Sequence, residues 1–130
     1  MTWNLNSIEF ESVTKLAPEK RYEYFIKKVA DWQEIWSLWN EGWVLMGDSD
    51  EHETVPVWPH AIFAEASAVD DWLGYKPRRI GLADWMEKWI PGIERDRRMI
   101  AVFPTLEGQT TTVNPARLKH DLEEELARYE

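Results

Sequence analysis

The sequence contains no cysteine, so it can form neither a disulfide bond nor a metal site with thiolate ligands. No apolar run approaches the roughly 18 residues that a membrane-spanning helix needs. The first residues, MTWNLNSIEFESV, lack a basic segment followed by an apolar stretch, which argues against a secretory signal. These absences predict a cytoplasmic protein.

Basic residues are scarce relative to acidic ones. The chain has 15 Lys and Arg against 24 Asp and Glu, which gives a net charge of −9. Such a charge repels phosphate groups, so it argues against nucleic acid as a partner, and we expect no membrane partner either. A basic protein would complement this charge, so we expect the partner to be another protein. Association between copies of the chain stays open.

The sequence also lacks a recognisable catalytic or cofactor motif. Its six glycines form no phosphate-binding loop, and its serines and three histidines form no nucleophile elbow. A triad assembled by folding stays open, because triads are defined by geometry rather than by sequence order. We predict no bound cofactor, and an enzyme is the less favoured class.

What the sequence has in excess is tryptophan, with nine among 130 residues. This length is typical of one ordinary domain, so we expect residues 1–130 to fold as a single unit. A core can absorb several indole rings, each of which needs an acceptor for its N–H group. Nine rings predict that at least one or two lie partly exposed in a groove or interface, where tryptophan is enriched.

The first long helix has an uncertain end. Pro18 suits the first helical position, and apolar residues recur at helical spacing after it. Aromatic residues continue that spacing, which would allow one helix from Pro18 to Glu41. The run IWSLW is nevertheless rich in strand formers, so we favour a strand over 34–39.

Three strands are then expected between residues 34 and 58. The strand at 34–39 pairs with a strand at 43–47 through a short hairpin loop, in which Gly42 takes a positive φ. A third strand covers 54–58 and contains Pro56. Since proline cannot donate a ladder hydrogen bond, this strand is expected to lie at an edge or to be bulged.

The rest of the chain alternates between helices and short strands. Pro59 begins a helix that ends at Gly74, and a loop or short strand follows around Ile80. The clearest helical stripe covers 82–93, where Pro91-Gly92 is expected to end or kink the helix. The elements expected after it are strands at 99–103 and 110–113 and a helix opened by Asn114-Pro115.

This order of elements predicts an α+β fold. Strands joined largely by hairpins, with helices between them, give a mixed, mostly antiparallel sheet of about five strands flanked by about four helices. Residues 1–13 show a loose alternation of apolar residues. They are expected to form an N-terminal arm or an edge strand.

Several segments resemble a family of small bacterial proteins known only as a domain of unknown function. The likeness covers the chain from residue 18 to its end, and PVWPH is its most specific part. It implies a bacterial cytoplasmic protein with no established activity. The order of a strand, an NP pair and a helix is also similar to the N-terminal domain of the SseB secretion-regulator family, in architecture alone. The segments that carry the family resemblance are RYEYFIKKV (21–29), GWVL (42–45), VPVWPHAIFAE (55–65), WMEKWIPG (85–92), VFP (102–104) and VNPARL (113–118).

A binding surface is predicted where segments 58–63 and 75–80 border the same helix. Tryptophan, tyrosine and arginine are the residue types in which binding energy concentrates. In the alternative interpretation Trp58 lies in the core and the arginines pair with Asp70 and Asp71. The predicted binding residues are Trp58, His60, Tyr75, Arg78 and Arg79.

His60 and the turn at 48–53 each have residue types that could carry chemistry, and each also has a simpler structural role. His60 stands near a helix start, where the helix dipole favours a neutral ring that could act as a base. The simpler role is a hydrogen bond to a backbone group or packing on Trp58. The turn at 48–53 holds one histidine and several carboxylates, but it lacks the glycine and distal glutamate of a calcium loop. We predict that this turn binds no metal.

The sequence therefore favours a protein that works by binding another protein. One form of this hypothesis is an immunity-type protein that neutralises a basic toxin domain. The alternative is a small hydrolase or ligand-binding domain with a pocket near His60 and the loop that carries Arg78 and Arg79.

Overall fold

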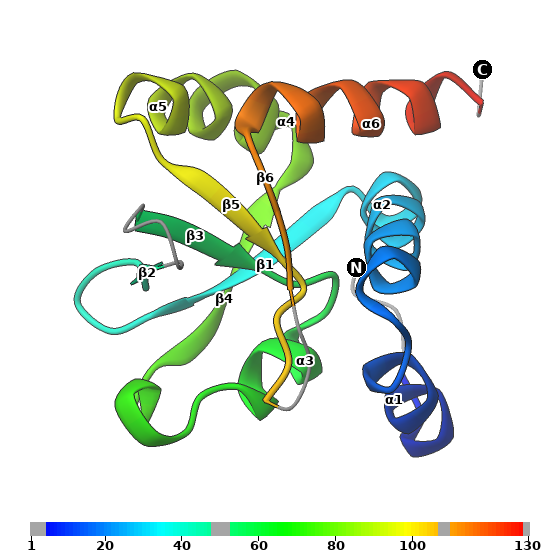
Figure 1. Cartoon of the computed structure of the whole chain (residues 1–130), viewed down its shortest axis with the longest axis vertical. Coiled ribbons are helices and arrows are strands. Elements are labelled where there is room, and N and C mark those ends of the chain that lie inside the picture. Colours follow the sequence, from blue (N-terminus) through cyan, green and yellow to red (C-terminus); the bar gives the residue numbers. More distant parts are fainter. Residues whose placement is uncertain (1–4, 48–52, 107–109, 129–130) are drawn as a thin grey trace.

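A computed structural model describes residues 5–47, 53–106 and 110–128 of the chain (Figure 1). The fold is α+β, as predicted. The elements in chain order are helices α1 (Ser7–Thr14) and α2 (Pro18–Trp32), strands β1 (Glu34–Trp39), β2 (Met46–Gly47) and β3 (Glu53–Val57), helix α3 (Ala61–Ala66), the 3-10 turn η1 (Asp70–Trp72), strand β4 (Lys76–Gly81), the consecutive helical segments α4 (Leu82–Asp84), η2 (Trp85–Trp89) and α5 (Ile90–Arg95), strands β5 (Met99–Val102) and β6 (Thr111–Val113), and helix α6 (Pro115–Ala127).

The strands form two small sheets that meet at one pair of residues. One sheet has the order β2-β3-β5-β6, and β1 pairs with β4 in the other. All pairs are antiparallel except the parallel pair β3–β5. Trp36 and Trp58 exchange backbone hydrogen bonds of 2.9 and 2.8 Å, which joins β1 to the chain just after β3. The predicted mixed, mostly antiparallel arrangement is confirmed.

The helices surround this strand layer and enclose the core. Figure 1 shows α5 and α6 along one side of the strands and α3 on the opposite side. Helix α2 packs against α6, β1 and β6, while α3 packs against β1 and β4. The side chains of Phe25, Leu38, Val57, Ile100 and Leu118 have no exposed surface. These residues come from α2, β1, β3, β5 and α6, so helices and strands together form a core large enough to fold without disulfides.

The strand predicted over 34–39 is confirmed, and the alternative of one long helix is wrong. Helix α2 ends because Gln33 adopts a left-handed conformation with φ 59°. The predicted partner was wrong, since β1 forms its ladder with β4 and shares only the Trp39–Trp43 bridge with the segment that follows. Glu41, not Gly42, takes the positive φ, of 57°.

Pro56 lies in an interior strand, which corrects the prediction of an edge or a bulge. The N–H of Phe103 donates to the carbonyl of Val57, so residue 57 faces β5. The neighbouring backbone groups of Pro56 therefore face the other way. There the carbonyl of Pro56 accepts the hydroxyl of Ser37, and no strand needs the missing N–H.

The helix predicted from Pro59 to Gly74 is shorter than expected. It begins at Ala61, because His60 has an extended backbone and caps the helix with its side chain. It ends at Ala66, and the chain turns again at Asp70, whose φ of 52° is incompatible with a continuing right-handed helix. Trp72 therefore lies on the separate turn η1.

The sequence predicts that Pro91-Gly92 ends or kinks its helix, and in the structure the helix does not end there but changes its winding just before Pro91. The turn before it is π-helical, so that the N–H of Ile90 bonds to the carbonyl of Trp85, five residues back. This wider turn accommodates the proline ring, which would otherwise clash with a carbonyl one turn earlier. The helix continues to Arg95.

The N-terminal prediction was wrong for the described residues, because α1 replaces the expected arm or edge strand. Asn6 starts this helix by accepting the N–H of Glu9 at 2.8 Å. The same chemistry confirms the predicted start of α6, where Asn114 accepts the N–H of Arg117 at 2.8 Å. Both helices begin at a local cap, and only the second had the additional signal of a following proline.

Candidate binding cleft

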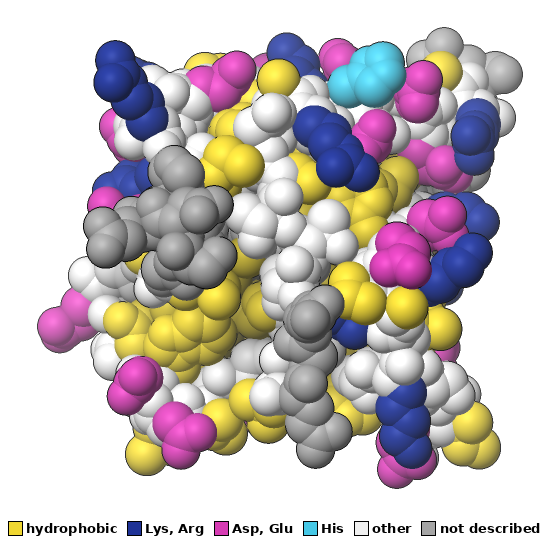
Figure 2. All heavy atoms as spheres, in the orientation of Figure 1, with side chains coloured by type: hydrophobic (Ala, Val, Ile, Leu, Met, Phe, Trp, Pro, Cys, Tyr) yellow, Lys and Arg dark blue, Asp and Glu magenta, His cyan; other side chains and the backbone are white. Residues whose placement is uncertain are grey.

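An open cleft of about 680 Å³ lies on the described surface. It lies between the segment 44–46, the turn η1 and the segment 104–106 that follows β5. Figure 2 shows hydrophobic side chains gathered on this face, with acidic side chains along the lower edge of the view. The apolar residues that line the cleft are Val44, Leu45, Met46, Val69, Trp72, Tyr75, Pro104 and Leu106.

Several of these apolar side chains are exposed to solvent. Leu106 is 66% exposed, and more than a third of the surface of Leu45 and of Val69 is exposed. Single exposed apolar residues are common, but a group of them in one concave place is typical of an interaction surface. The cleft therefore combines hollow shape with accessible apolar area.

Two carboxylates stand at the edge of the cleft. Asp70 and Asp71 are exposed on η1, and both line the hollow. Within the described part of the chain, neither carboxylate has an ion-pair or hydrogen-bond partner. The alternative interpretation that the arginines pair with these two residues is wrong. Their charge is available to a cationic group from outside.

Buried polar groups fix the wall formed by the segment 104–106. Phe103 ends β5 in a left-handed conformation with φ 57°, which turns the chain toward the cleft. Its carbonyl accepts the Nε–H of the buried Arg21 at 3.3 Å, and burial lowers the pKa of that guanidinium. The next carbonyl, of Pro104, accepts the indole N–H of Trp58 at 2.9 Å. These contacts hold a strained turn that would otherwise relax.

The structure places two of the five predicted binding residues, Tyr75 and Trp58, at or behind this cleft. Tyr75 lines it. Trp58 is 0% exposed and packs edge-on against Trp72, with 6.2 Å between ring centroids. His60 is 5% exposed, and its Nδ1 accepts the N–H of Ile62 at 3.1 Å. Trp58 thus supports the cleft from inside through Trp72, whereas His60 is a buried helix cap, and neither side chain can form the rim.

The two predicted arginines lie on β4 and do not line the cleft. The guanidinium carbon of Arg78 lies 4.4 Å from the centroid of the Trp39 ring. The Nε–H of Arg79 donates to Glu34 at 2.7 Å, and that carboxylate is buried. The five residues are therefore not brought to one surface, since adjacent strand positions face opposite sides of a sheet.

Sequence reasoning missed the residues that line the open part of the cleft. Asp70 and Asp71 enter the sequence analysis only as possible counterions, although two adjacent carboxylates beside Trp72 form a signal of an acidic, apolar edge. Leu106 is an apolar residue in a short segment that begins with proline and lies before Gly108, where loops are otherwise polar. Such an unexpectedly apolar loop residue is the signal that could have identified this wall.

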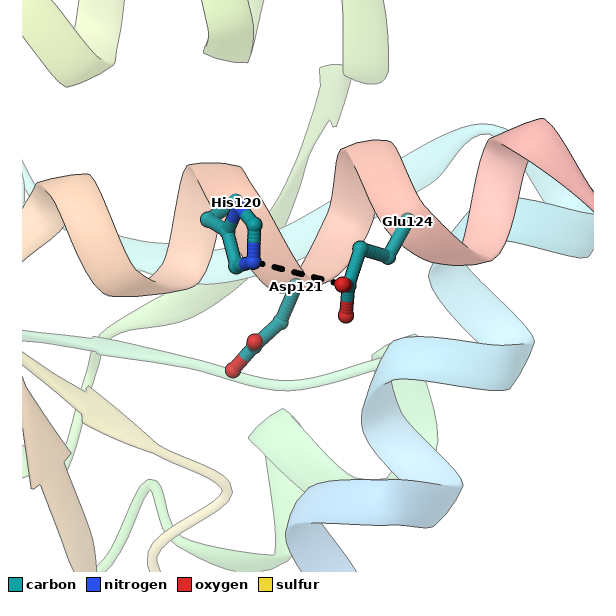
Figure 3. Close-up of side chains that lie close together, drawn as sticks. All are labelled: His120, Asp121 and Glu124. Atoms are coloured by element: carbon teal, nitrogen blue, oxygen red, sulfur yellow. Dashed lines mark ion pairs between the residues drawn. The ribbon is translucent and has the colours of Figure 1, made fainter.

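One cluster has the residue types of a metal site. His120, Asp121 and Glu124 on α6 present ligand atoms within 4.8 Å of one another (Figure 3). His120 and Glu124 form a pair at 3.3 Å. Asp121 already accepts the hydroxyl of Tyr22 at 2.5 Å, and His120 and Glu124 are exposed, so the cluster is not organised for a metal. The predicted turn at 48–53 lies almost entirely outside the described residues.

Comparison with known proteins gives a family but no activity. Among the described residues, no helix has both the length and the apolar character needed to cross a membrane. No curated protein and no solved structure is significantly similar to the chain. The family described as a protein of unknown function (DUF2750) matches residues 22–122, so the chain belongs to that family.

Proposed function

We propose that this member of the DUF2750 family works in the cytoplasm by binding another protein through the cleft at 44–46, η1 and 104–106. The observation that supports this most is the combination of exposed apolar side chains with two unpaired carboxylates in one hollow. The partner that fits is a basic segment that also carries apolar side chains. The net charge of −9 favours its approach over longer distances.

The two kinds of contact have different roles in this proposal. Covering the exposed part of Leu106 contributes on the order of 1–2 kcal/mol of binding free energy. The exposed carboxylates of Asp70 and Asp71 contribute less affinity, because water and salt screen them. They instead select basic partners and accelerate their association.

An immunity-type protein is the concrete form of this function that we propose. A toxin domain that acts on nucleic acid is commonly basic, because it must approach phosphate groups. An acidic cleft with an apolar floor would cover such a surface. The placement of His60 does not favour the hydrolase alternative, because its Nδ1 already accepts a backbone N–H and its ring is buried.

Affinity capture with the purified chain as bait tests the proposal. The double variant Asp70→Lys, Asp71→Lys reverses the charge at the cleft, and Glu87→Lys, Glu123→Lys makes the same change in net charge at exposed sites elsewhere. We expect the wild type and the control to retain one basic protein, identified by mass spectrometry, and the cleft variant to lose it. Equal capture by both variants, or an acidic partner, would refute the proposal.

A further inference from the structure

A second hollow, of about 210 Å³, adjoins the cleft. It lies between α1, α3 and the segment 103–106, and we call it the recess. The recess and the cleft share Ser67, Pro104, Thr105 and Leu106 as lining residues. A ligand chain that occupies the cleft can therefore extend one side chain into the recess.

The walls of the recess are aromatic. Phe10 stacks on Phe63 with 5.4 Å between the ring centroids and 13° between the planes. Phe103 lies tilted against Phe63 at 4.6 Å. Such rings offer faces and edges on which a further ring packs favourably. A cavity of about 150 Å³ holds benzene in a protein interior, so the volume of the recess suits one six-membered ring.

Ser67 stands where the recess meets the cleft. It is only 7% exposed and lines both hollows. Its backbone N–H donates to Ala64 and its carbonyl accepts from Val69, so the backbone is satisfied. Its hydroxyl has no hydrogen-bond partner among the residues that the structure describes. The oxygen of this hydroxyl is reached by solvent, so a ligand group that bonds to it gains the modest net free energy of one hydrogen bond.

We propose that the recess receives one aromatic side chain of the partner, while Ser67 hydrogen-bonds the peptide group beside it. This inference rests on the proposed function and specifies the partner's contact segment. That segment carries an aromatic residue with basic residues nearby, which lie against Asp70 and Asp71. The aromatic residue is the buried anchor of the interface, and the charged contacts form its rim.

The anchor is tested without the partner by using N-acetyl-phenylalaninamide as the probe. It presents one ring and two peptide groups, and N-acetyl-alaninamide is the matched probe that lacks the ring. Titration is followed by the ¹H–¹⁵N shifts of the amide at residue 67, which both the wild type and Ser67→Ala contain. We expect saturable binding of the first probe alone, and about three- to tenfold weaker binding to Ser67→Ala, as for the loss of one hydrogen bond.

A second test fills the recess with a larger side chain. Ala66 lines the recess, so Ala66→Leu should abolish binding of the probe and capture of the partner. Ala83→Leu, an exposed change on α4, is the control and should alter neither. The inference is overturned if the wild type does not bind the phenylalanine probe, or if Ala66→Leu binds it or captures the partner as well as the wild type does.

The two proposals fail in different experiments. Asp70 and Asp71 line the cleft and not the recess, so their reversal to lysine should leave binding of the probe unchanged. Probe binding together with charge-independent capture would support the recess and refute the acidic docking surface. Charge-dependent capture that survives Ala66→Leu would refute the anchor and support the docking surface.

Discussion

Replacing Arg79 with alanine removes one ion-pair partner of a buried carboxylate. Glu34 is 1% exposed, and one of its oxygens accepts the Nε–H of Arg79 at 2.7 Å. Removing one partner of a fully buried ion pair costs about 3–5 kcal/mol, because the remaining charge stays out of water. The side chain of Arg79 is 53% exposed, so water enters where the guanidinium was. We therefore expect a smaller loss, of about 2–3 kcal/mol.

Arg78 is the matched control, because it is the next residue on the same strand. It lies over the rings of Trp39 and Trp43 and has no ion pair within the described residues. Its replacement by alanine loses a partly exposed cation–π contact, which costs about 0.5–1 kcal/mol. Urea unfolding followed by tryptophan fluorescence measures both variants.

A further substitution separates charge from packing. Adding Glu34→Gln to Arg79→Ala should restore most of the stability, since a neutral amide is less costly to bury than a carboxylate. If Arg79→Ala and Arg78→Ala destabilise equally, or if Glu34→Gln restores nothing, the assignment of a buried charge is wrong.

Three other predictions concern single side chains. Replacing His60 with alanine removes the cap of α3 and should lower the free energy of unfolding by about 0.5–2 kcal/mol. Replacing it with asparagine, which can also cap a helix, should retain most of that stability. Urea unfolding measures both variants. The pKa values of Tyr22 and Tyr24 are raised, mainly because the hydroxyls are buried and also because each donates a hydrogen bond to a carboxylate. Above a pH of about 10, tyrosines ionise in the unfolded chain, whereas these two stay protonated in the folded protein. The stability that their buried hydroxyls contribute is therefore complete below that pH and is lost as the pH rises above it. A thermal midpoint that stays flat over this range, in wild type and Tyr22→Phe alike, would contradict this. Calorimetric titration with zinc should show no sub-micromolar site at His120, because Asp121 is already bonded, and His120→Ala should give the same heat.

Elements with local signals were predicted well from the sequence. Pro18 and Asn114-Pro115 mark helix starts, because proline and a capping side chain act on the first turn without help from the rest of the fold. The partner of β1 was not predictable in this way. The choice of β4 over the adjacent segment depends on packing between residues about forty positions apart in sequence, as with Trp36 opposite Arg79.

The candidate site was predicted only in part for a related reason. Tyr75 lines the cleft, but Trp58 lies behind Trp72, and His60 is buried as the cap of α3. A tryptophan suits both a binding surface and a core in which a carbonyl accepts its N–H, and the sequence does not distinguish the two. The sequence predicts Arg78 and Arg79 on a binding surface, with pairing to the nearby Asp70 and Asp71 as the alternative, whereas the register of β1 and β4 brings Arg79 to Glu34.

The tryptophans near the cleft form a chain of contacts with an optical consequence. Trp39, Trp43, Trp89 and Trp85 follow one another with centroid separations of 5.0, 4.7 and 5.6 Å. Indole transitions this close couple, so circular dichroism of the folded chain contains an exciton couplet beside the helix and strand bands. Trp43 directly precedes the cleft wall at 44–46. The couplet therefore gives an intrinsic, label-free signal for whether that wall stays docked against the helix that carries Trp89.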